Sequence, residues 1–231
     1  MFSRVISAAV YGIDAHIVNV ETDVGFGLPT FDMSGALGSK VREAKDRVKV
    51  AIKNSGIELK PQKIVINISP ANIRKEGTSY DLPIAIGILA ANGCFDLKVL
   101  ENVLIIGEVS LDGSINPVKG VLPIVCAAME AGIGNCIIPK ANIAEGRIIN
   151  NINIYGVETL SQTIEILKNI AVIDESKKKV KCLVVETDDV KSNKHPCSYN
   201  IDYRDISGQE AAKRATMIAV SGMHNIMYIG P

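Results

Sequence analysis

The residues that could bind a metal ion are few in this sequence and poorly spaced for that chemistry. Its 231 residues include five cysteines and three histidines. No two cysteines form a Cys-x-x-Cys pair, and several lie in apolar runs such as Val125-Cys126-Ala127. A structural zinc site needs closely spaced pairs of such ligands. The sequence therefore predicts small buried thiols in a reducing compartment and no bound metal.

Basic side chains form a second group that could do chemistry. Apolar residues recur at helical spacing over 39–55, which predicts an amphipathic helix with Ser39 as its N-cap and Gly56 as its stop. The polar face of this helix carries an excess of basic residues, namely Lys40, Arg42, Lys45, Arg47, Lys49 and Lys53. Such a face could contact nucleic acid. A charged helix face is more often simply solvated, and we favour that interpretation.

These side chains must be positioned by elements that alternate in type along the first 170 residues. Runs rich in β-branched residues predict a hairpin and four further strands, at 4–20, 63–68, 103–109, 136–138 and 152–154. Helical spacing predicts four helices, at 39–55, 81–91, 120–131 and 160–170. Glycines and a proline at 25–35 predict a loop. We therefore expect residues 1–170 to form one α/β or α+β domain.

The helix expected at 81–91 is apolar nearly all round, so it should be buried. Asp81 is suited to be its N-cap, and Pro83 fits the first turn, where a missing N–H does no harm. Ser79 also carries a hydroxyl that could cap this helix. We expect one of these two side chains to satisfy the free N–H groups at the helix start.

The composition changes after residue 170. Residues 171–198 are dense in charged side chains, which indicates a linker. A second unit is expected over 199–231. There, apolar spacing predicts a helix over 208–220, and a buried-type strand at 225–229 runs into Gly230-Pro231.

The overall composition limits the kinds of partner. Lys plus Arg and Asp plus Glu each number 25, so nucleic acid could be held only by a local patch or by an assembly of several copies. Trp is absent and aromatic residues make up 4%, which argues against a chain built around base-stacking surfaces. The longest apolar stretch, Leu82 to Ala91, is too short to span a bilayer, and the N-terminus lacks a signal peptide's apolar region. We expect a cytoplasmic protein without membrane contact.

The segment from Asp202 to Pro231 resembles a known family. It holds the box Asp205-Ile206-Ser207-Gly208-Gln209, then a helix, then a strand that ends in Gly-Pro. In this order the parts resemble the entry to the AAA+ ATPase module of Mg-chelatase-like proteins. In that family the loop continues Gly-Pro-Pro-Gly-x-Gly-Lys-Thr, whose backbone N–H groups surround phosphates and whose Lys and Thr complete the site.

This resemblance implies ATP and Mg²⁺ as cofactors of the complete protein. It assigns nucleotide binding to Ile206, Gln209, Gly230 and Pro231. Only the last two belong to the phosphate-binding loop, and the Lys and Ser/Thr that position the phosphates are not among the 231 residues. We therefore expect these residues by themselves not to hydrolyse ATP and to bind no cofactor tightly.

Four segments of the first domain resemble the N-terminal domain of the ComM/YifB group. They are Gly27 to Phe31, Ser69 to Gly77, Tyr80 to Ala85 and Ile106 to Gly113. The last of them also resembles the Lon protease domain. The resemblance implies the fold of the Lon proteolytic domain, which is related to the second domain of ribosomal protein S5.

Lon-type peptidases use a Ser–Lys dyad, in which a Lys of lowered pKa accepts the proton of the Ser hydroxyl. The resemblance places Ser79 at the nucleophile position and Leu122 where the general-base Lys should be. Leu cannot accept a proton. Lys119, one helical turn earlier, or Lys75 would have to replace it. We therefore interpret the domain as an inactive Lon-type scaffold without catalytic residues.

For the complete protein, the resemblance implies an ATP-driven motor that assembles as a homo-oligomeric, hexameric ring. Its expected partner is single-stranded or branched DNA, and its expected role is branch migration or helicase action in recombination or natural transformation. Insertion of magnesium into a porphyrin is not implied. Two alternatives stay open: a Ser–Lys peptidase that uses Ser79, and a regulatory or oligomerisation module without a DNA role.

Overall fold

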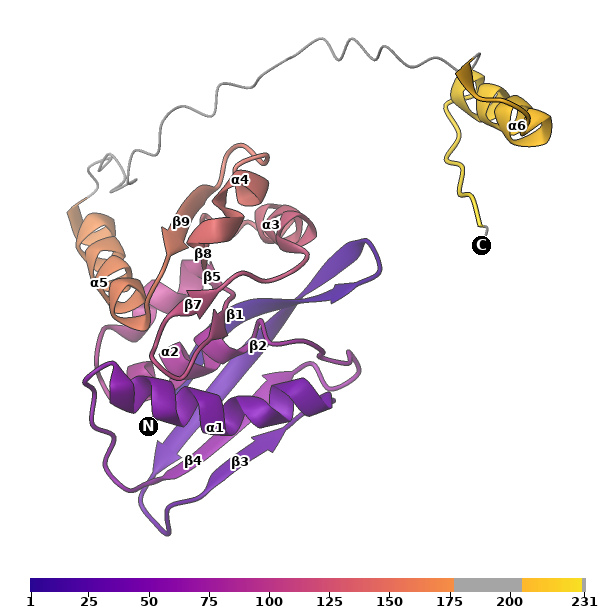
Figure 1. Ribbon diagram of the computed structural model, residues 1–231. Helices are drawn as coiled ribbons and strands as arrows, with labels where there is room; N and C mark the ends of the chain where they lie inside the picture. Colours follow the sequence, from indigo (N-terminus) through magenta and orange to yellow (C-terminus); the bar gives the residue numbers. More distant parts are fainter. Residues whose placement is uncertain (177–204, 230–231) are drawn as a thin grey trace. The chain divides into compact units, whose positions relative to one another are not determined.

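The computed structural model describes residues 1–176 and 205–229. The chain divides into two compact units, one up to Val185 and one from Glu186, and each is described by itself. The first unit is an α/β domain (Figure 1), which confirms the predicted fold class.

A mixed seven-stranded sheet, in the order β3-β4-β2-β1-β5-β8-β9, is the centre of the first unit. Its strands are β1 (Phe2–Tyr11), β2 (Asp14–Gly25), β3 (Phe31–Ser34), β4 (Lys63–Ser69), β5 (Val103–Ile105), β8 (Asn135–Pro139) and β9 (Asn153–Val157). The pairs β1–β2 and β2–β4 are antiparallel, and the other neighbouring strands are parallel. A small second sheet pairs β6 (Glu108–Val109) with β7 (Ile115–Asn116).

The sheet divides the core in two, and helices cover both of its faces. They are α1 (Ser39–Asn54), α2 (Asp81–Ala91), α3 (Val121–Glu130), α4 (Ile143–Gly146) and α5 (Leu160–Ser176), with the 3₁₀ helices η1 (Leu97–Asn102) and η2 (Lys140–Asn142). Val103 and Ile105 pack with α1, α2 and α5, whereas Leu104 packs with α3. Successive strand residues point to opposite faces, so β5 contributes to both cores. All residues of α2 are buried, as its sequence predicts.

The first unit departs from the predicted elements at several places. The run 103–109 is not one strand: it divides into β5 and β6, which lie in different sheets. The segment 25–35 contains β3, which pairs in parallel with β4. Ser39 does not cap α1, since the N-cap is Gly38 and no side chain caps this helix. Helix α5 continues to Ser176, past the expected start of the linker, and residues 177–198 lie outside the described ones.

In the second unit, α6 (Glu210–Ser221) ends at Gly222 as expected. The strand predicted at 225–229 is wrong, because these residues form no regular element. Within 205–229 no other strand is present to pair with them, so their backbone has no ladder to join. Instead, the Tyr228 hydroxyl donates a hydrogen bond to the Ala212 carbonyl (3.3 Å). Large apolar side chains of this unit stay exposed, among them Met217, Ile218, Met223, Met227 and Ile229.

Three of the five thiols lie in the described part of the chain. Cys94, Cys126 and Cys136 are all free, and Cys136 is buried. Burial raises the pKa of Cys136 to about 12, so its thiol stays protonated and unreactive at neutral pH. Cys182 and Cys197 lie outside the described residues. Within the described part, no helix combines the length and apolar character needed to cross a bilayer.

Candidate functional site

Ser79, the candidate nucleophile, lies directly before α2. Its backbone carbonyl accepts a hydrogen bond from Gly107 N–H (3.0 Å), and the Gly107 carbonyl accepts one from Leu82 N–H (3.0 Å). The N-cap of α2 is Tyr80, and no side chain caps the helix. The expectation that Ser79 or Asp81 caps α2 is therefore wrong, because the Gly107 carbonyl, in the connection between β5 and β6, accepts from one of the free N–H groups.

Gly107 makes this junction possible because it has no side chain. A Cβ atom there would lie 3.0 Å from Leu82 Cδ2 and 3.1 Å from Ile115 Cγ2. Such distances are tighter than ordinary van der Waals contact. The strand therefore breaks between β5 and β6 at Gly107, where the backbone forms hydrogen bonds with Ser79 and Leu82 at the start of α2.

Asp81 is the first residue of α2, and its carboxylate contacts residues of other elements. Its side chain is 0% exposed and binds the Arg47 guanidinium in bidentate fashion, at 2.8 and 3.0 Å. Val109 N–H also donates to it (3.4 Å). Burial raises the pKa of Asp81, and the attraction of Arg47 offsets this only in part. The pair joins α1, α2 and β6, so one member of the predicted basic face of α1 is structural and not solvated.

A chain of polar contacts runs beside Ser79. The Thr78 hydroxyl donates to Glu108 Oε2. Asn116 Nδ2 donates to Glu108 Oε1 (3.4 Å) and to the Ser110 hydroxyl (2.9 Å). Within residues 1–176 the Ser79 hydroxyl has no hydrogen-bond partner. The neighbouring Glu108 carboxylate thus accepts from Thr78, and none of the described residues offers a base in hydrogen-bond contact with the Ser79 hydroxyl.

Leu122, at the expected position of the general base, lies in the first turn of α3. Its side chain is half-buried and lines a groove of about 520 Å³ between α3 and the tip of the β1–β2 hairpin. His16 and Cys126 also line this groove, and Ser79 does not. Leu122 is therefore a half-buried residue at the wall of this groove and not a packed core side chain.

The two lysines considered as replacement bases differ in environment. Lys119 is exposed. Lys75 is 0% exposed, and its ammonium donates to the Pro70 carbonyl. Burial lowers the pKa of Lys75, as a general base would need, but the ammonium is bound within its own loop. No local sequence signal indicates the burial of Lys75, because it depends on contacts with the segment before α1.

In the second unit, the box before α6 is held by the first turn of that helix. Gly208 and Gln209 both have left-handed backbone conformations, with φ of 74° and 56°. The Lys213 ammonium donates to the Ile206 carbonyl (2.5 Å), and Lys213 N–H donates to the Gln209 carbonyl (2.9 Å). The side chains of Ile206 and Gln209 are exposed. Gly230 and Pro231 lie outside the described residues.

Family models match both units of the chain. The model described as subunit ChlI of Mg-chelatase matches residues 20–142, and the model described as magnesium chelatase, subunit ChlI, matches residues 202–231. An α/β domain and a second unit that both match Mg-chelatase subunits thus define the class of protein. The chain belongs to the Mg-chelatase-like family, in its ComM/YifB group.

Several relatives match nearly the whole chain. The competence protein ComM of Haemophilus influenzae is 35% identical over 227 residues, which are 98% of this chain and 43% of that protein. The uncharacterized protein YifB of Escherichia coli is 34% identical over 229 residues, 99% of this chain and 42% of YifB. The chain thus spans less than half the length of these relatives.

Part of the chain also matches a protease. The archaeal Lon protease of Thermococcus kodakarensis is 31% identical over 139 residues, which are 58% of this chain and 22% of the protease. Together with the mixed sheet, this similarity confirms the Lon-like fold of the first unit.

Proposed function

We propose that this chain is the N-terminal part of an ATP-dependent DNA motor that migrates or unwinds DNA branches in recombination or natural transformation. The observation that supports this most is the similarity to the competence protein ComM, which extends over both units. On this proposal residues 1–170 are the Lon-like domain, 171–198 a linker, and 199–231 the start of the ATPase module. The complete protein would act in the cytoplasm as a hexameric ring.

The first unit serves this motor as a scaffold and not as a peptidase. A Ser hydroxyl becomes a useful nucleophile only when a base takes its proton. Leu122 cannot do so, Lys119 is exposed, and the Lys75 ammonium is bound to Pro70. Next to Ser79, the buried Asp81 carboxylate is taken up by its ion pair with Arg47, which is a structural contact.

Two described residues of the second unit support this assignment of a nucleotide site. The Ile206 side chain is 42% exposed and offers an apolar face, and the exposed amide of Gln209 offers both a donor and an acceptor. These residues would hold the adenine base of ATP. Gly230 and Pro231 would open the loop around the phosphates, where Mg²⁺ supplies charge stabilisation for phosphoryl transfer when it is bound.

A strand-displacement assay tests this proposal. A form of the protein that carries a complete ATPase module is incubated with forked DNA, with and without ATP. We expect the labelled strand to be released only with hydrolysable ATP. Release that is independent of ATP, or no release from any forked or four-way substrate, would favour the regulatory or oligomerisation module.

A further inference from the structure

A groove with basic walls lies between α1, β3 and the segment 57–62. It has a volume of about 660 Å³. Its lining residues are Pro29, Thr30, Phe31, Asp32, Lys45, Lys49, Leu59, Lys60, Pro61, Gln62, Ile64 and Ile88. None of the contacts of the Ser79 region uses these residues. The groove is therefore separate from the site aligned with the Lon dyad.

Three lysines line this groove, and a fourth stands between two of its lining residues, Gln62 and Ile64. Lys45 and Lys49 are one helical turn apart on α1, Lys60 comes from the segment before β4, and Lys63 begins β4. All four are exposed, and within the part of the chain that the structure describes none of them is in an ion pair. Among the described lining residues the one carboxylate is Asp32. The local charge is thus positive although the chain as a whole is neutral.

Apolar side chains lie beside these charges. Phe31, Ile64 and Ile88 line the groove and are buried. On the β2–β3 loop, which leads into the groove at Pro29, Phe26 and Leu28 are 106% and 84% exposed.

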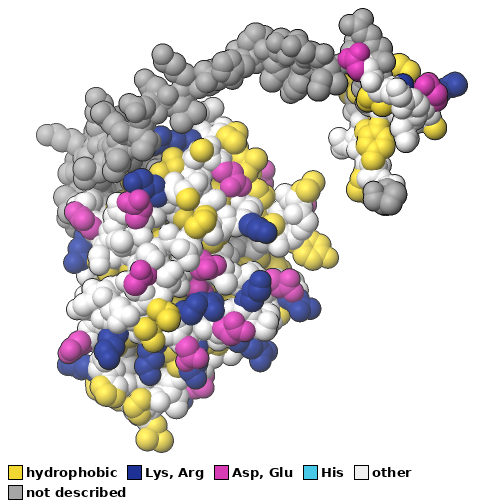
Figure 2. Space-filling view, viewed as in Figure 1, with side chains coloured by type: hydrophobic (Ala, Val, Ile, Leu, Met, Phe, Trp, Pro, Cys, Tyr) yellow, Lys and Arg dark blue, Asp and Glu magenta, His cyan; other side chains and the backbone are white. Residues whose placement is uncertain are grey.

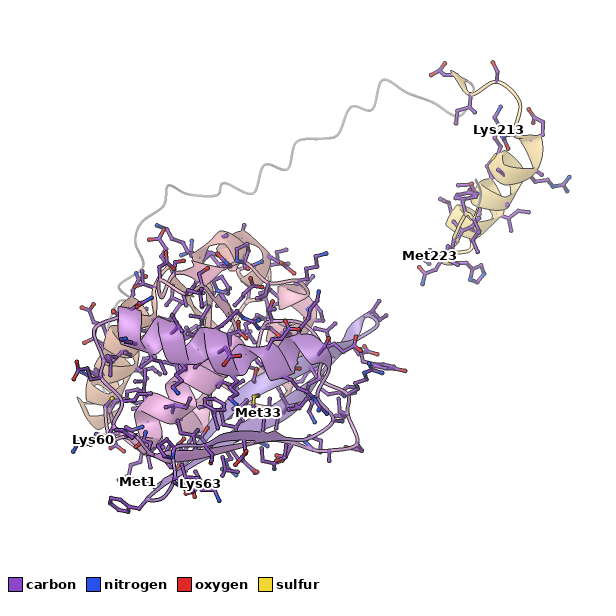
Figure 3. All side chains as sticks on the ribbon, turned by 60° about the horizontal axis from the view of Figure 1, so that its bottom comes forward. Met1, Met33, Lys60, Lys63, Lys213 and Met223 are labelled. Carbon is purple, nitrogen blue, oxygen red and sulfur yellow. The ribbon has the colours of Figure 1, made fainter. Side chains whose placement is uncertain are left out.

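The loop and the lysines share one end of the first unit. A Cβ on Gly27 would lie 4.0 Å from Lys63 Cβ, so the loop passes next to that lysine. Hydrophobic side chains protrude at the lower edge of Figure 2, where Figure 1 places this loop. Figure 3 shows Lys60 and Lys63 at the same end as Met1.

We propose that this groove binds single-stranded nucleic acid, with phosphates at the four lysines and a base stacked on Phe26. The combination fits because every base has a face that stacks on an aromatic ring, while lysines follow the backbone. A concave site also suits a narrow polymer better than a flat bilayer. The inference rests on the proposed function and adds a DNA contact in the first unit, outside the ATPase module.

Binding of a fluorescein-labelled oligothymidine to the 231-residue chain, followed by anisotropy over a range of salt concentrations, tests this inference. We expect Lys45→Glu/Lys49→Glu/Lys60→Glu to weaken binding by about 10-fold or more and to reduce the salt slope by about 2. Phe26→Ala should weaken binding by about 5-fold or more and leave the slope unchanged. The matched control is Lys98→Glu/Lys119→Glu/Lys168→Glu, which makes the same change of charge at exposed lysines elsewhere. It should bind as the unmodified chain does.

Two results would overturn the inference. One is an unmodified chain that does not bind the oligonucleotide, or groove variants that bind it no more weakly than the control. The other is binding to phosphatidylserine vesicles or to an acidic peptide that depends on the groove lysines while oligonucleotide binding does not.

A parallel measurement of DNA-stimulated ATP hydrolysis, in a form with a complete ATPase module, separates this inference from the proposed function. If DNA stimulates hydrolysis and the groove variants are stimulated equally, the motor proposal stands and the groove inference is rejected. If the oligonucleotide binds in the groove but DNA does not stimulate ATP hydrolysis, the groove inference stands and the motor proposal is rejected.

Discussion

At the scale of single residues, the buried charge of Asp81 joins three elements of the first unit, namely α1, α2 and β6. Its carboxylate is fully buried and depends on Arg47 for charge compensation. Burial raises the pKa of Asp81, so this carboxylate is less stable in its charged form in the folded protein than in the unfolded chain. Its contribution to stability therefore grows as the pH falls through the folded pKa and is lost as the pH rises through it.

Replacing Arg47 should unfold this junction in a pH-dependent manner. Arg47→Met leaves Asp81 buried without its partner, which should cost about 3–5 kcal/mol of unfolding free energy at neutral pH. The loss should shrink as the pH falls, because a protonated Asp81 needs no counter-charge. Denaturant unfolding over a pH series measures this. Arg42→Met, which removes only a bond to the Leu37 carbonyl, is the matched control; an equal loss in both variants at every pH would contradict the account.

Ser79 makes no capping contact, so its removal should matter little. We expect Ser79→Ala to change the unfolding free energy by no more than about 0.5 kcal/mol. This is less than a lost helix cap would cost. The unmodified chain should also stay unlabelled by a fluorophosphonate. Labelling that Ser79→Ala abolishes would show that a base is available after all, and Lys75 would be the first candidate.

Leu122 offers a sharper test of the scaffold interpretation. The side chain lines an open groove, so in Leu122→Lys the new stem can stay in place while the ammonium reaches water. We expect a loss of about 1 kcal/mol or less and no cleavage of casein. Leu104→Lys, at a fully buried position of β5, should cost several times more. Casein cleavage by Leu122→Lys that needs Ser79 would instead reveal a complete protease cleft.

At the scale of elements, Gly107 controls how β5, β6 and α2 meet. Gly107→Ala would press a methyl group against Leu82 and Ile115, and we expect it to cost about 1–3 kcal/mol. Thermal or denaturant unfolding measures this. Gly25→Ala is the control, because no atom lies within 4 Å of its added Cβ. A Gly107→Ala variant as stable as this control would mean that the junction is looser than described.

The elements that the sequence predicts well are those whose signals are local. The bounds of α2 agree with the expected 81–91, because its apolar run begins at an Asp-Leu-Pro start and ends before Asn92-Gly93. The hairpin of β1 and β2 follows in the same way from β-branched runs around Gly12.

The elements that the sequence misses depend on distant partners. β3 is four residues long and lies in a segment rich in glycine, and it becomes a strand only by pairing with β4. The break after β5 and the burial of Lys75 likewise arise from contacts with other segments. In the candidate site, the resemblance identified Ser79 and Leu122, whereas the Arg47–Asp81 pair could be found only in three dimensions.

At the scale of the whole molecule, the two units differ in how completely they bury their apolar side chains. The first unit has a core on both faces of its sheet. In the second unit, Ala219 is the one buried apolar residue among 205–229. Exposed apolar surface of this kind normally contacts a partner. Residues 202–231 match the model described as magnesium chelatase, subunit ChlI. On the proposed function, that partner would be the rest of an ATPase module, and the domain limits stay predictions.

The rate of ATP hydrolysis with and without DNA tests the motor most directly. The measurement uses a form of the protein with a complete ATPase module, purified free of nucleic acid. The account predicts hydrolysis that rises when single-stranded or branched DNA is added, because a motor couples its nucleotide cycle to its track. A rate that DNA leaves unchanged, or the absence of hydrolysis under any condition, would contradict the central claim.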